Sequence, residues 1–162
     1  PLFKNLFIFE MANNHQGDVN HGLAIIREMG KIKRKYNLNA GVKFQYRQLD
    51  TFIHPDYRNN TEAKHISRFL STELPLADYY KMVQATREEG LVTICTPFDE
   101  ESVDVIAKHG IEIIKVASCS ADDWPLLQKI AKAGKPVIAS TGGLLMPQID
   151  SLVSFLRHRT VD

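Results

Sequence analysis

Two lysines interrupt otherwise apolar stretches of this sequence, and they are its clearest candidates for chemistry. Lys115 lies within residues 111–118 and Lys43 lies within residues 40–45, and both stretches are typical of buried parallel strands. Burying an ammonium group costs several kcal/mol unless an anion or hydrogen-bond acceptors compensate for it. A lysine stem can instead carry its head to solvent. Two such lysines near the ends of two strands nevertheless favour one shared anionic ligand.

Other polar side chains stand at or near the ends of the predicted strands. Gln45 shares a strand face with Lys43 because it lies two residues further on. Glu10 ends an apolar strand, where it could transfer a proton or orient a hydroxyl, or only form a salt bridge with a lysine. Three hydroxyls could donate hydrogen bonds to phosphate or carboxylate oxygens, although each alone is equally typical of an ordinary strand end: Thr96, Ser118 and Ser140.

The remaining candidate groups give weaker signals. His15 stands in a polar turn, where a hydrogen-bonded loop histidine is more common than a ligand, and the six histidines lack metal-ligand spacing. The turn at residues 140–143 resembles a phosphate-binding turn, which alone means little. Cys95 and Cys119 lie inside or just after predicted strands, so we expect two small buried thiols.

Composition sets the limits of the interpretation. A chain of 162 residues with 44% hydrophobic and 24% charged residues can form one domain with a proper core. Its net charge of +1 gives no reason to expect nucleic acid or an anionic membrane surface as a partner. No apolar run approaches the roughly 20 residues that span a bilayer, and no secretory signal pattern begins the chain. We therefore expect a cytoplasmic protein.

Hydrophobic periodicity predicts five strand–helix units. The expected strands are residues 6–12, 41–45, 91–96, 111–118 and 136–140. Three aspartates are placed to cap the helices that follow: Asp18, Asp99 and Asp123. The first helix should turn Ile25, Met29 and Ile32 inward. Residues 46–74 interrupt the rhythm as a polar segment with a helical turn near residues 62–69, typical of a binding loop, a lid or a disordered stretch.

Two α/β architectures fit five such units. A flavodoxin-like doubly wound sheet is complete at this length, whereas a TIM-type (β/α)8 barrel typically needs about 250 residues. The polar side chains favour the barrel, because all its strands converge on one mouth, whereas an open sheet uses only the strands beside its switch point. We therefore predict that residues 1–162 form the first five units of a barrel. Such a piece leaves two strand edges unpaired, so we expect the gene to continue past Asp162 or another copy to cover the edge.

Five motifs in order make the sequence resemble the sialic acid synthase family. Residues 10–18, EMANNHQGD, resemble the family's E-I-G-x-N-H-x-G-D opening. The resemblance continues through residues 42–45 (VKFQ), 95–99 (CTPFD), 114–118 (IKVAS) and 139–142 (ASTG), and so covers essentially the whole chain. The family condenses phosphoenolpyruvate with N-acetylmannosamine or a related sugar to a sialic-acid-type nonulosonic acid, releasing phosphate. Its fold is an eight-unit barrel, often followed by an antifreeze-like domain, and this chain would lack units six to eight.

The resemblance also implies roles for the strand-end residues. Glu10 and Lys115 would be catalytic, and Glu10 and Gln45 would face the sugar and the reacting centre. Phosphoenolpyruvate would be bound by five residues: Lys43, Thr96, Lys115, Ser118 and Ser140. Ala12 replaces a family glycine, a mild change. Ser120 replaces an acidic residue of the family, which puts the identity of the sugar in doubt.

The family also implies a cofactor and partners. A divalent metal, manganese or magnesium, would polarise the sugar aldehyde. Its two histidine ligands lie on later strands, so no metal ligand is assigned in this chain. The partners would be small molecules, phosphoenolpyruvate and an amino sugar, and a homo-oligomer is expected.

Two other functions remain open from the residues. A barrel aldolase could use Lys115 or Lys43 as a Schiff-base nucleophile. A catalytically silent domain could instead bind an anionic metabolite or a partner protein.

Overall fold

Five parallel strands form a single sheet in the part of the chain that the structure describes, a computed structural model covering residues 2–60 and 62–159. They are β1 (Leu6–Glu10), β2 (Asn39–Tyr46), β3 (Val92–Pro97), β4 (Ile113–Val116) and β5 (Val137–Ala139). The strand order is β1-β2-β3-β4-β5, the same as the chain order. A flavodoxin-like sheet would run 2-1-3-4-5. The sequential order therefore confirms the predicted half of a (β/α)-type barrel.

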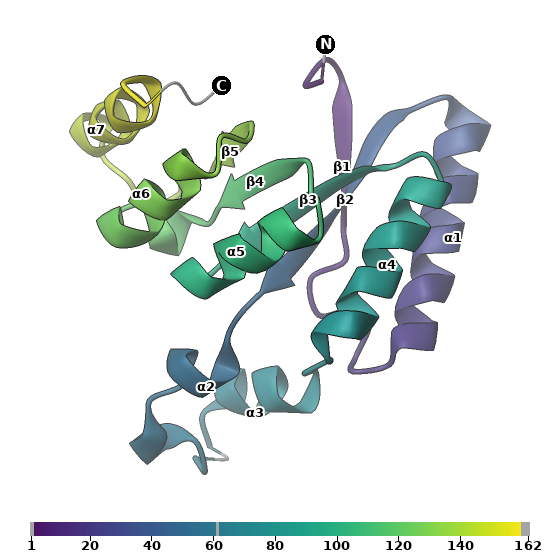
Figure 1. Cartoon of the computed structure of the whole chain (residues 1–162), viewed down its shortest axis with the longest axis horizontal. Helices are drawn as coiled ribbons and strands as arrows, with labels where there is room; N and C mark the ends of the chain where they lie inside the picture. The colour runs from purple at the N-terminus through teal and green to yellow at the C-terminus, as the bar shows by residue number, and fades with distance from the viewer. Residues whose placement is uncertain (1, 61, 160–162) are drawn as a thin grey trace.

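The helices that connect the strands lie along one face of this sheet (Figure 1). They are α1 (Val19–Tyr36), α4 (Leu76–Glu88), α5 (Glu100–Lys108) and α6 (Trp124–Lys132), and α7 (Met146–Arg157) follows β5. α1 and α4 lie side by side, as do α5 and α6 (Figure 1). A barrel keeps its helices on the outer face, which leaves the other face of the sheet as the barrel interior.

All three predicted helix caps are present. Asp18 accepts a hydrogen bond from the Asn20 N–H at 2.8 Å, and Asp99 accepts one from the Ser102 N–H at 2.7 Å. Asp123 caps α6 through the Leu126 N–H at 3.1 Å. Each bond satisfies a donor that the first turn of a helix leaves without an intrahelical partner.

The core lies between the sheet and its helices. Val42, Phe44 and Tyr46 alternate along β2 and are buried against them. The prediction for α1 was partly wrong, because Ile32 is 42% exposed whereas Ile26 is fully buried. A one-residue shift turns a helix position by about 100°, and Gly22, Ile26 and Gly30 form the buried line of α1.

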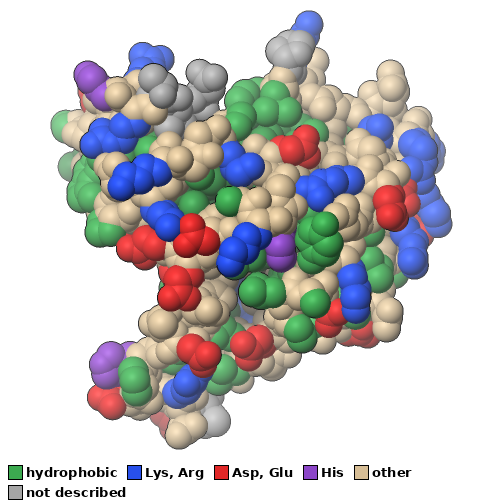
Figure 2. Space-filling view, viewed as in Figure 1, with side chains coloured by type: hydrophobic (Ala, Val, Ile, Leu, Met, Phe, Trp, Pro, Cys, Tyr) green, Lys and Arg blue, Asp and Glu red, His purple; other side chains and the backbone are tan. Residues whose placement is uncertain are grey.

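Residues 46–60 and 62–74 form structured turns that project from the body of the molecule (Figures 1 and 2). The segment contains α2 (Leu49–Phe52), a 3-10 turn η1 (Pro55–Tyr57) and α3 (Lys64–Ser71). The helical turn expected near residues 62–69 is α3. Hydrogen bonds tie the segment to the body at both ends: Asn13 Nδ2 donates to Thr72 Oγ1 at 2.9 Å, and the Gln48 N–H donates to Asp99 Oδ2 at 2.8 Å.

Two further expectations need correction. Cys95 is buried, but Cys119 is exposed because the short 3-10 turn η2 (Ser118–Ser120) ends β4 and turns its side chain outward. β4 is also shorter than predicted. Glu112 leaves the strand pattern because its carboxylate accepts hydrogen bonds from the Thr93 N–H and hydroxyl, at 2.9 and 3.0 Å.

Candidate functional site

The register of the sheet places both candidate lysines on the same face. Glu10 pairs with Lys43 between β1 and β2, and Gln45 pairs with Thr96 between β2 and β3. The same face continues onto β4, because Ile94 pairs with Ile113 and Lys115 lies two residues beyond Ile113. Side chains two apart on a strand point the same way. Glu10, Lys43 and Lys115 therefore lie on the interior face, opposite the helices. The polar side chains of this face at the strand ends are called the interior layer.

Glu10 and Lys43 form an ion pair, with Oε2 and Nζ 2.7 Å apart. The Lys43 side chain is only 11% exposed, whereas that of Glu10 is 50% exposed. The backbone fixes this pair, because the Met11 and Ala12 N–H groups both donate to the Lys43 carbonyl. Ala12 adopts a left-handed φ of 41°, which ends β1 at that point. The salt bridge foreseen for Glu10 is present, at the carboxyl ends of the strands.

Lys115 has no such partner among the described residues. No carboxylate there lies within ion-pair distance of its ammonium group, and no hydrogen bond reaches it. Burial lowers the pKa of Lys115 below the ordinary lysine value, and Lys43 lowers it further, while Glu10 and Cys119 act in the opposite direction. Two ammonium groups therefore share one carboxylate, and the layer keeps an excess positive charge that a bound anion would neutralise.

Thr96 lies in the same layer and is a second polar group without a partner. Its hydroxyl is buried and has no hydrogen-bond partner among the described residues. Buried polar groups are nearly always hydrogen-bonded, so an orphan of this kind calls for an explanation. A ligand oxygen beside Lys115 would satisfy it.

Ser118 and Ser140 extend the layer toward β5. The Ser140 N–H donates to the Val116 carbonyl at 3.0 Å, which places Ser140 directly beyond β5 beside the end of β4. Ser118 approaches the turn that follows, since a Cβ atom added at Gly142 would lie 3.7 Å from the Ser118 Cβ atom. The glycine therefore allows close contact between the two loops, and both hydroxyls lie near the mouth.

His15 forms hydrogen bonds within its loop and with Tyr79, as is more common than ligand binding for a histidine in a polar turn. It is fully buried. Its Nδ1 atom accepts the Gly17 N–H at 3.2 Å, and its Nε2 atom lies 3.4 Å from the Tyr79 hydroxyl. Burial, with a smaller effect of His21, lowers the pKa of His15. The neutral ring therefore orders the loop after β1.

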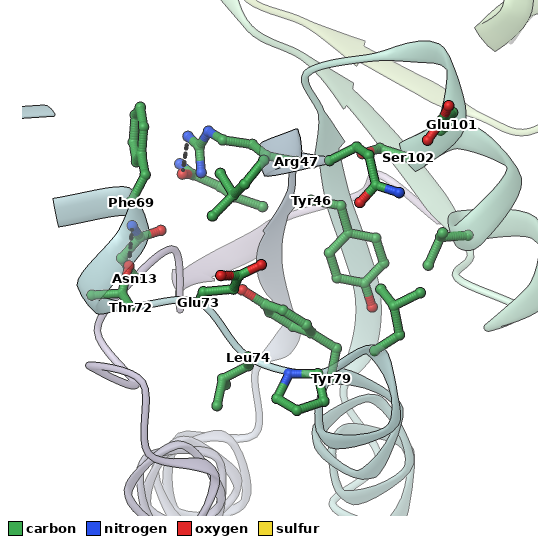
Figure 3. A pocket seen from close by; sticks show the side chains of 16 residues that line it. Asn13, Tyr46, Arg47, Phe69, Thr72, Glu73, Leu74, Tyr79, Glu101 and Ser102 are labelled. Carbon is green, nitrogen blue, oxygen red and sulfur yellow. Dashed lines mark hydrogen bonds between the residues drawn. The ribbon is translucent and has the colours of Figure 1, made fainter. Parts of the chain in front are cut away.

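One cavity was not anticipated from the sequence. It has a volume of about 260 Å³ and lies beside the interior layer, between the end of β2, the 46–74 segment and the N-terminal ends of α4 and α5 (Figure 3). Gln45 belongs to both the layer and the cavity wall, and its Oε1 atom accepts a hydrogen bond from Arg47 Nη2 at 2.7 Å. The other polar side chains of the wall include Asn13, Arg47, Glu73 and Tyr79.

Within residues 2–60 and 62–159, no three His, Cys, Asp or Glu side chains gather closely enough to hold a metal ion. These residues therefore do not by themselves fit a divalent metal. No helix within the same residues has the length and apolar character needed to cross a bilayer.

A half-barrel with two lysines and several hydroxyls at its strand ends defines a barrel-type α/β protein, a class whose chemistry belongs at the carboxyl ends of the strands. Comparison with known proteins then identifies the family. Residues 29–162 match the NeuB family, and the chain belongs to it. This confirms the sialic acid synthase resemblance read from the motifs.

Individual relatives agree with this assignment. The N,N'-diacetyllegionaminic acid synthase of Campylobacter jejuni is 29% identical over 163 residues, covering 94% of this chain and 47% of that protein. A Chromobacterium violaceum structure, assigned as spore coat polysaccharide biosynthesis protein E, is 52% identical with a TM-score of 0.95 and covers 98% of this chain and 47% of its own.

A more distant structure shares the fold. The N-acetylneuraminic acid synthetase of Leptospira borgpetersenii, solved with citrate, is 25% identical with a TM-score of 0.81, over 97% of this chain and 51% of its own. This chain spans less than half the length of the curated relatives it matches.

Proposed function

We propose that the natural protein carrying this chain condenses phosphoenolpyruvate with an N-acetylmannosamine-like sugar to a sialic-acid-type nonulosonic acid and releases phosphate. One observation carries the proposal: Lys115 lies near Lys43 without an ion-pair partner in the described chain, in a layer that also holds the unpartnered Thr96 hydroxyl. Phosphoenolpyruvate carries a carboxylate and a phosphate, and ammonium and hydroxyl donors suit both. Relatives of this chain named as synthases support the reaction class.

The reaction balances with water as the only further reactant. The methylene carbon of phosphoenolpyruvate forms a bond to the aldehyde carbon of the open-chain sugar, and the aldehyde oxygen takes a proton to become a hydroxyl. Water adds to the phosphate-bearing carbon, and cleavage of that carbon's bond to the phosphate oxygen releases phosphate and leaves a keto acid. Positioning the two reactants is the main contribution expected of the layer.

Glu10 and the lysines would have separate duties. Lys43 and Lys115 would hold the anionic ends of phosphoenolpyruvate and balance the charge that moves onto the departing phosphate. Glu10 is half exposed at the mouth and paired with Lys43, so its carboxylate could accept a proton from the attacking water. Ser118 and Ser140 would add hydrogen bonds from the β4 and β5 ends.

The metal enters only as a proposal about the complete protein. A manganese or magnesium ion would be held by residues outside this chain and would polarise the sugar aldehyde. Because the described residues do not by themselves fit a metal, no step is derived through it. Ser120, which stands where the family has an acidic side chain, is buried at 7% exposure and supplies only a hydroxyl to this region.

One observation favours a second function. A lysine whose pKa burial lowers, as for Lys115, is also suited to form a Schiff base with a keto substrate. Borohydride treatment in the presence of pyruvate separates the two reactions. A covalent adduct at Lys115 supports the aldolase, whereas the condensation leaves the lysine unmodified.

The direct test measures phosphate release from phosphoenolpyruvate by the natural protein, with manganese and a panel of N-acetylated amino sugars. We expect release that requires both phosphoenolpyruvate and a sugar, and that falls by roughly 100-fold or more in Lys115→Met. Lys132→Met is the matched control, because Lys132 is an exposed lysine on α6. No release with any sugar, together with unchanged phosphoenolpyruvate binding in Lys115→Met, would contradict the proposal and favour a silent domain.

A further inference from the structure

The cavity beside Gln45 contains a cation, Arg47, that forms no ion pair in the described chain, although the carboxylates of Glu73 and Glu101 also line the cavity. The Arg47 guanidinium lies over the rings of Phe98 and Phe69, with its central carbon 3.9 and 4.4 Å from their centroids. Its Nη2 atom donates to Gln45, and this is its only hydrogen bond among the described residues. Its Nε atom is buried and has no partner there, and no carboxylate in the described chain forms an ion pair with it. Aromatic rings compensate only part of the cost of burying a charge.

Arg47 therefore has the character of a binding group. Arginines that serve only the fold are normally paired when buried. The planar fork of a guanidinium matches the oxygens of a carboxylate or phosphate, and stacking between two rings holds that fork in one orientation. An oxyanion placed in the cavity would supply the missing counter-charge.

The opposite side of the cavity offers groups suited to hydroxyls. The tautomer of His15 defines the hydrogen bond to Tyr79. Because His15 Nδ1 accepts the Gly17 N–H, the ring proton of the neutral His15 must lie on Nε2. That N–H points to the Tyr79 oxygen, which leaves the Tyr79 hydroxyl free to donate. The Glu73 carboxylate lines the same space and forms no ion pair in the described chain, and Asn13 donates to Thr72, leaving its amide oxygen as an acceptor (Figure 3).

The cavity meets the layer proposed to hold phosphoenolpyruvate at Gln45, the one side chain that the two share among the described residues. Lys43 and Gln45 are two residues apart on β2, a step of about 6.6 Å in a strand, and Arg47 follows directly after β2 ends at Tyr46. The Arg47–Gln45 hydrogen bond links the two regions. A molecule whose reactive end lies near Glu10 and whose far end lies on Arg47 would pass directly over Gln45.

We propose that this cavity receives an acidic group of the acceptor sugar, a carboxylate or a phosphate remote from the aldehyde, and that Arg47 selects for it. The sugar hydroxyls bond to Glu73, Asn13 and the Tyr79 hydroxyl. This inference rests on the proposed condensation, and it adds that the acceptor is an acidic rather than a neutral amino sugar.

The test compares three sugars on the natural protein: N-acetylmannosamine, its primary-hydroxyl phosphate ester and its uronic acid. Calorimetry measures the binding of each sugar, and phosphate release from phosphoenolpyruvate measures turnover. We expect at least one acidic sugar to bind roughly 10- to 100-fold more tightly than the neutral one, as for a hydrogen bond to a charged group. The phosphate and uronic acid arms decide which oxyanion the cavity prefers.

Variants assign the preference to Arg47. Arg47→Met keeps an apolar stem between the rings and should abolish the preference while leaving phosphoenolpyruvate binding unchanged. Arg47→Lys should restore part of it, because the charge returns without the fork. Arg27→Met is the matched control, since Arg27 is an exposed arginine on α1. If Arg47→Met does not fold, the comparison of sugars on the unaltered protein and on Arg47→Lys still decides.

Each outcome separates this inference from the reaction on which it rests. Equal binding of neutral and acidic sugars, with phosphoenolpyruvate consumed, overturns the inference and leaves the condensation standing. A preference for an acidic sugar that depends on Arg47, with no consumption of phosphoenolpyruvate, supports the acidic-sugar site and contradicts the condensation. A preference that survives in Arg47→Met overturns the role of Arg47.

Discussion

Lys115 is the residue whose charge state should determine how well the interior layer binds an anion. Its ammonium group is partly buried, lies near Lys43 and has no carboxylate of its own in the described chain, so its pKa falls below the ordinary lysine value. A base whose folded pKa is lowered opposes folding while it is charged. The free energy of unfolding should therefore rise as pH increases through this lowered pKa. An anionic ligand reverses the preference, because it favours the protonated form.

Phosphoenolpyruvate binding should consequently weaken at alkaline pH. We expect its affinity to be constant while Lys115 is protonated and to fall as pH rises through the lowered pKa, before exposed lysines titrate. Lys115→Arg keeps its charge over this range and should remove the alkaline loss. Calorimetric titration at a series of pH values measures both. An alkaline fall that is identical in Lys115→Arg would assign the titration to another group.

Thr96 and Thr93 give a matched pair of hydroxyls on one strand. Thr96→Val removes a buried hydroxyl without a partner, so the free energy of unfolding should stay equal or rise by about 1 kcal/mol. Phosphoenolpyruvate affinity should fall by roughly 5- to 10-fold, the loss of one hydrogen bond. Thr93→Val instead breaks hydrogen bonds to Glu112 and should destabilise by about 1–3 kcal/mol without changing affinity. Urea unfolding and calorimetry measure the two quantities, and a destabilised Thr96→Val that binds normally would contradict the ligand role.

At the scale of elements, the sequence was informative where one period dominates. Alternation along β2 was sufficient to place Lys43 and Gln45 on one face, and the side-chain oxygens of Asp18, Asp99 and Asp123 cap the helices as expected. The length of β4 and the exposure of Cys119 could not be predicted from the sequence. Both depend on contacts with neighbouring strands, through the turn η2 and the Glu112 hydrogen bonds.

Arg47 shows why the cavity could not be read from the sequence. Its aromatic neighbours come from α2, α3 and the loop after β3, at Phe52, Phe69 and Phe98. No short-range pattern joins positions so far apart. The spacing of two residues predicts that Arg47 points the same way as Gln45. Without the tertiary fold, however, Arg47 is typical of an ordinary charged loop residue.

Asp99 connects α5 with the start of α2, and its replacement should destabilise both. Its Oδ1 atom caps α5 and its Oδ2 atom accepts the Gln48 N–H that begins α2. Asp99→Ala should destabilise by about 1–2 kcal/mol and also loosen the 46–74 segment. Asp123→Ala, which removes only the cap of α6, should cost about 1 kcal/mol and leave that segment unchanged. Hydrogen exchange over residues 46–74 distinguishes the two, and equal protection in both variants would show that Asp99 does not hold the segment.

At the scale of the whole molecule, the described sheet ends in two free edges. β1 and β5 each pair with one strand only, and the β1 edge exposes Phe7 at 54% and Ile8 at 39%. Open edges with exposed apolar side chains promote pairing with other chains. The relatives that this chain matches are more than twice as long as the part they share with it. A closed barrel would cover both edges with further strands.

Residues 1–162 produced alone should therefore self-associate through these edges. We expect size-exclusion chromatography with light scattering to give oligomers that grow with concentration, whereas Phe7→Lys shifts the population toward monomer because a charge on an edge strand opposes pairing. Ile32→Lys is the matched control, since Ile32 is a similarly exposed apolar residue on α1, away from either edge. It should leave the association unchanged. A monomer that stays soluble at high concentration without any substitution would mean that the half-barrel protects its own edges, and equal effects of the two lysines would place the contact elsewhere than on β1.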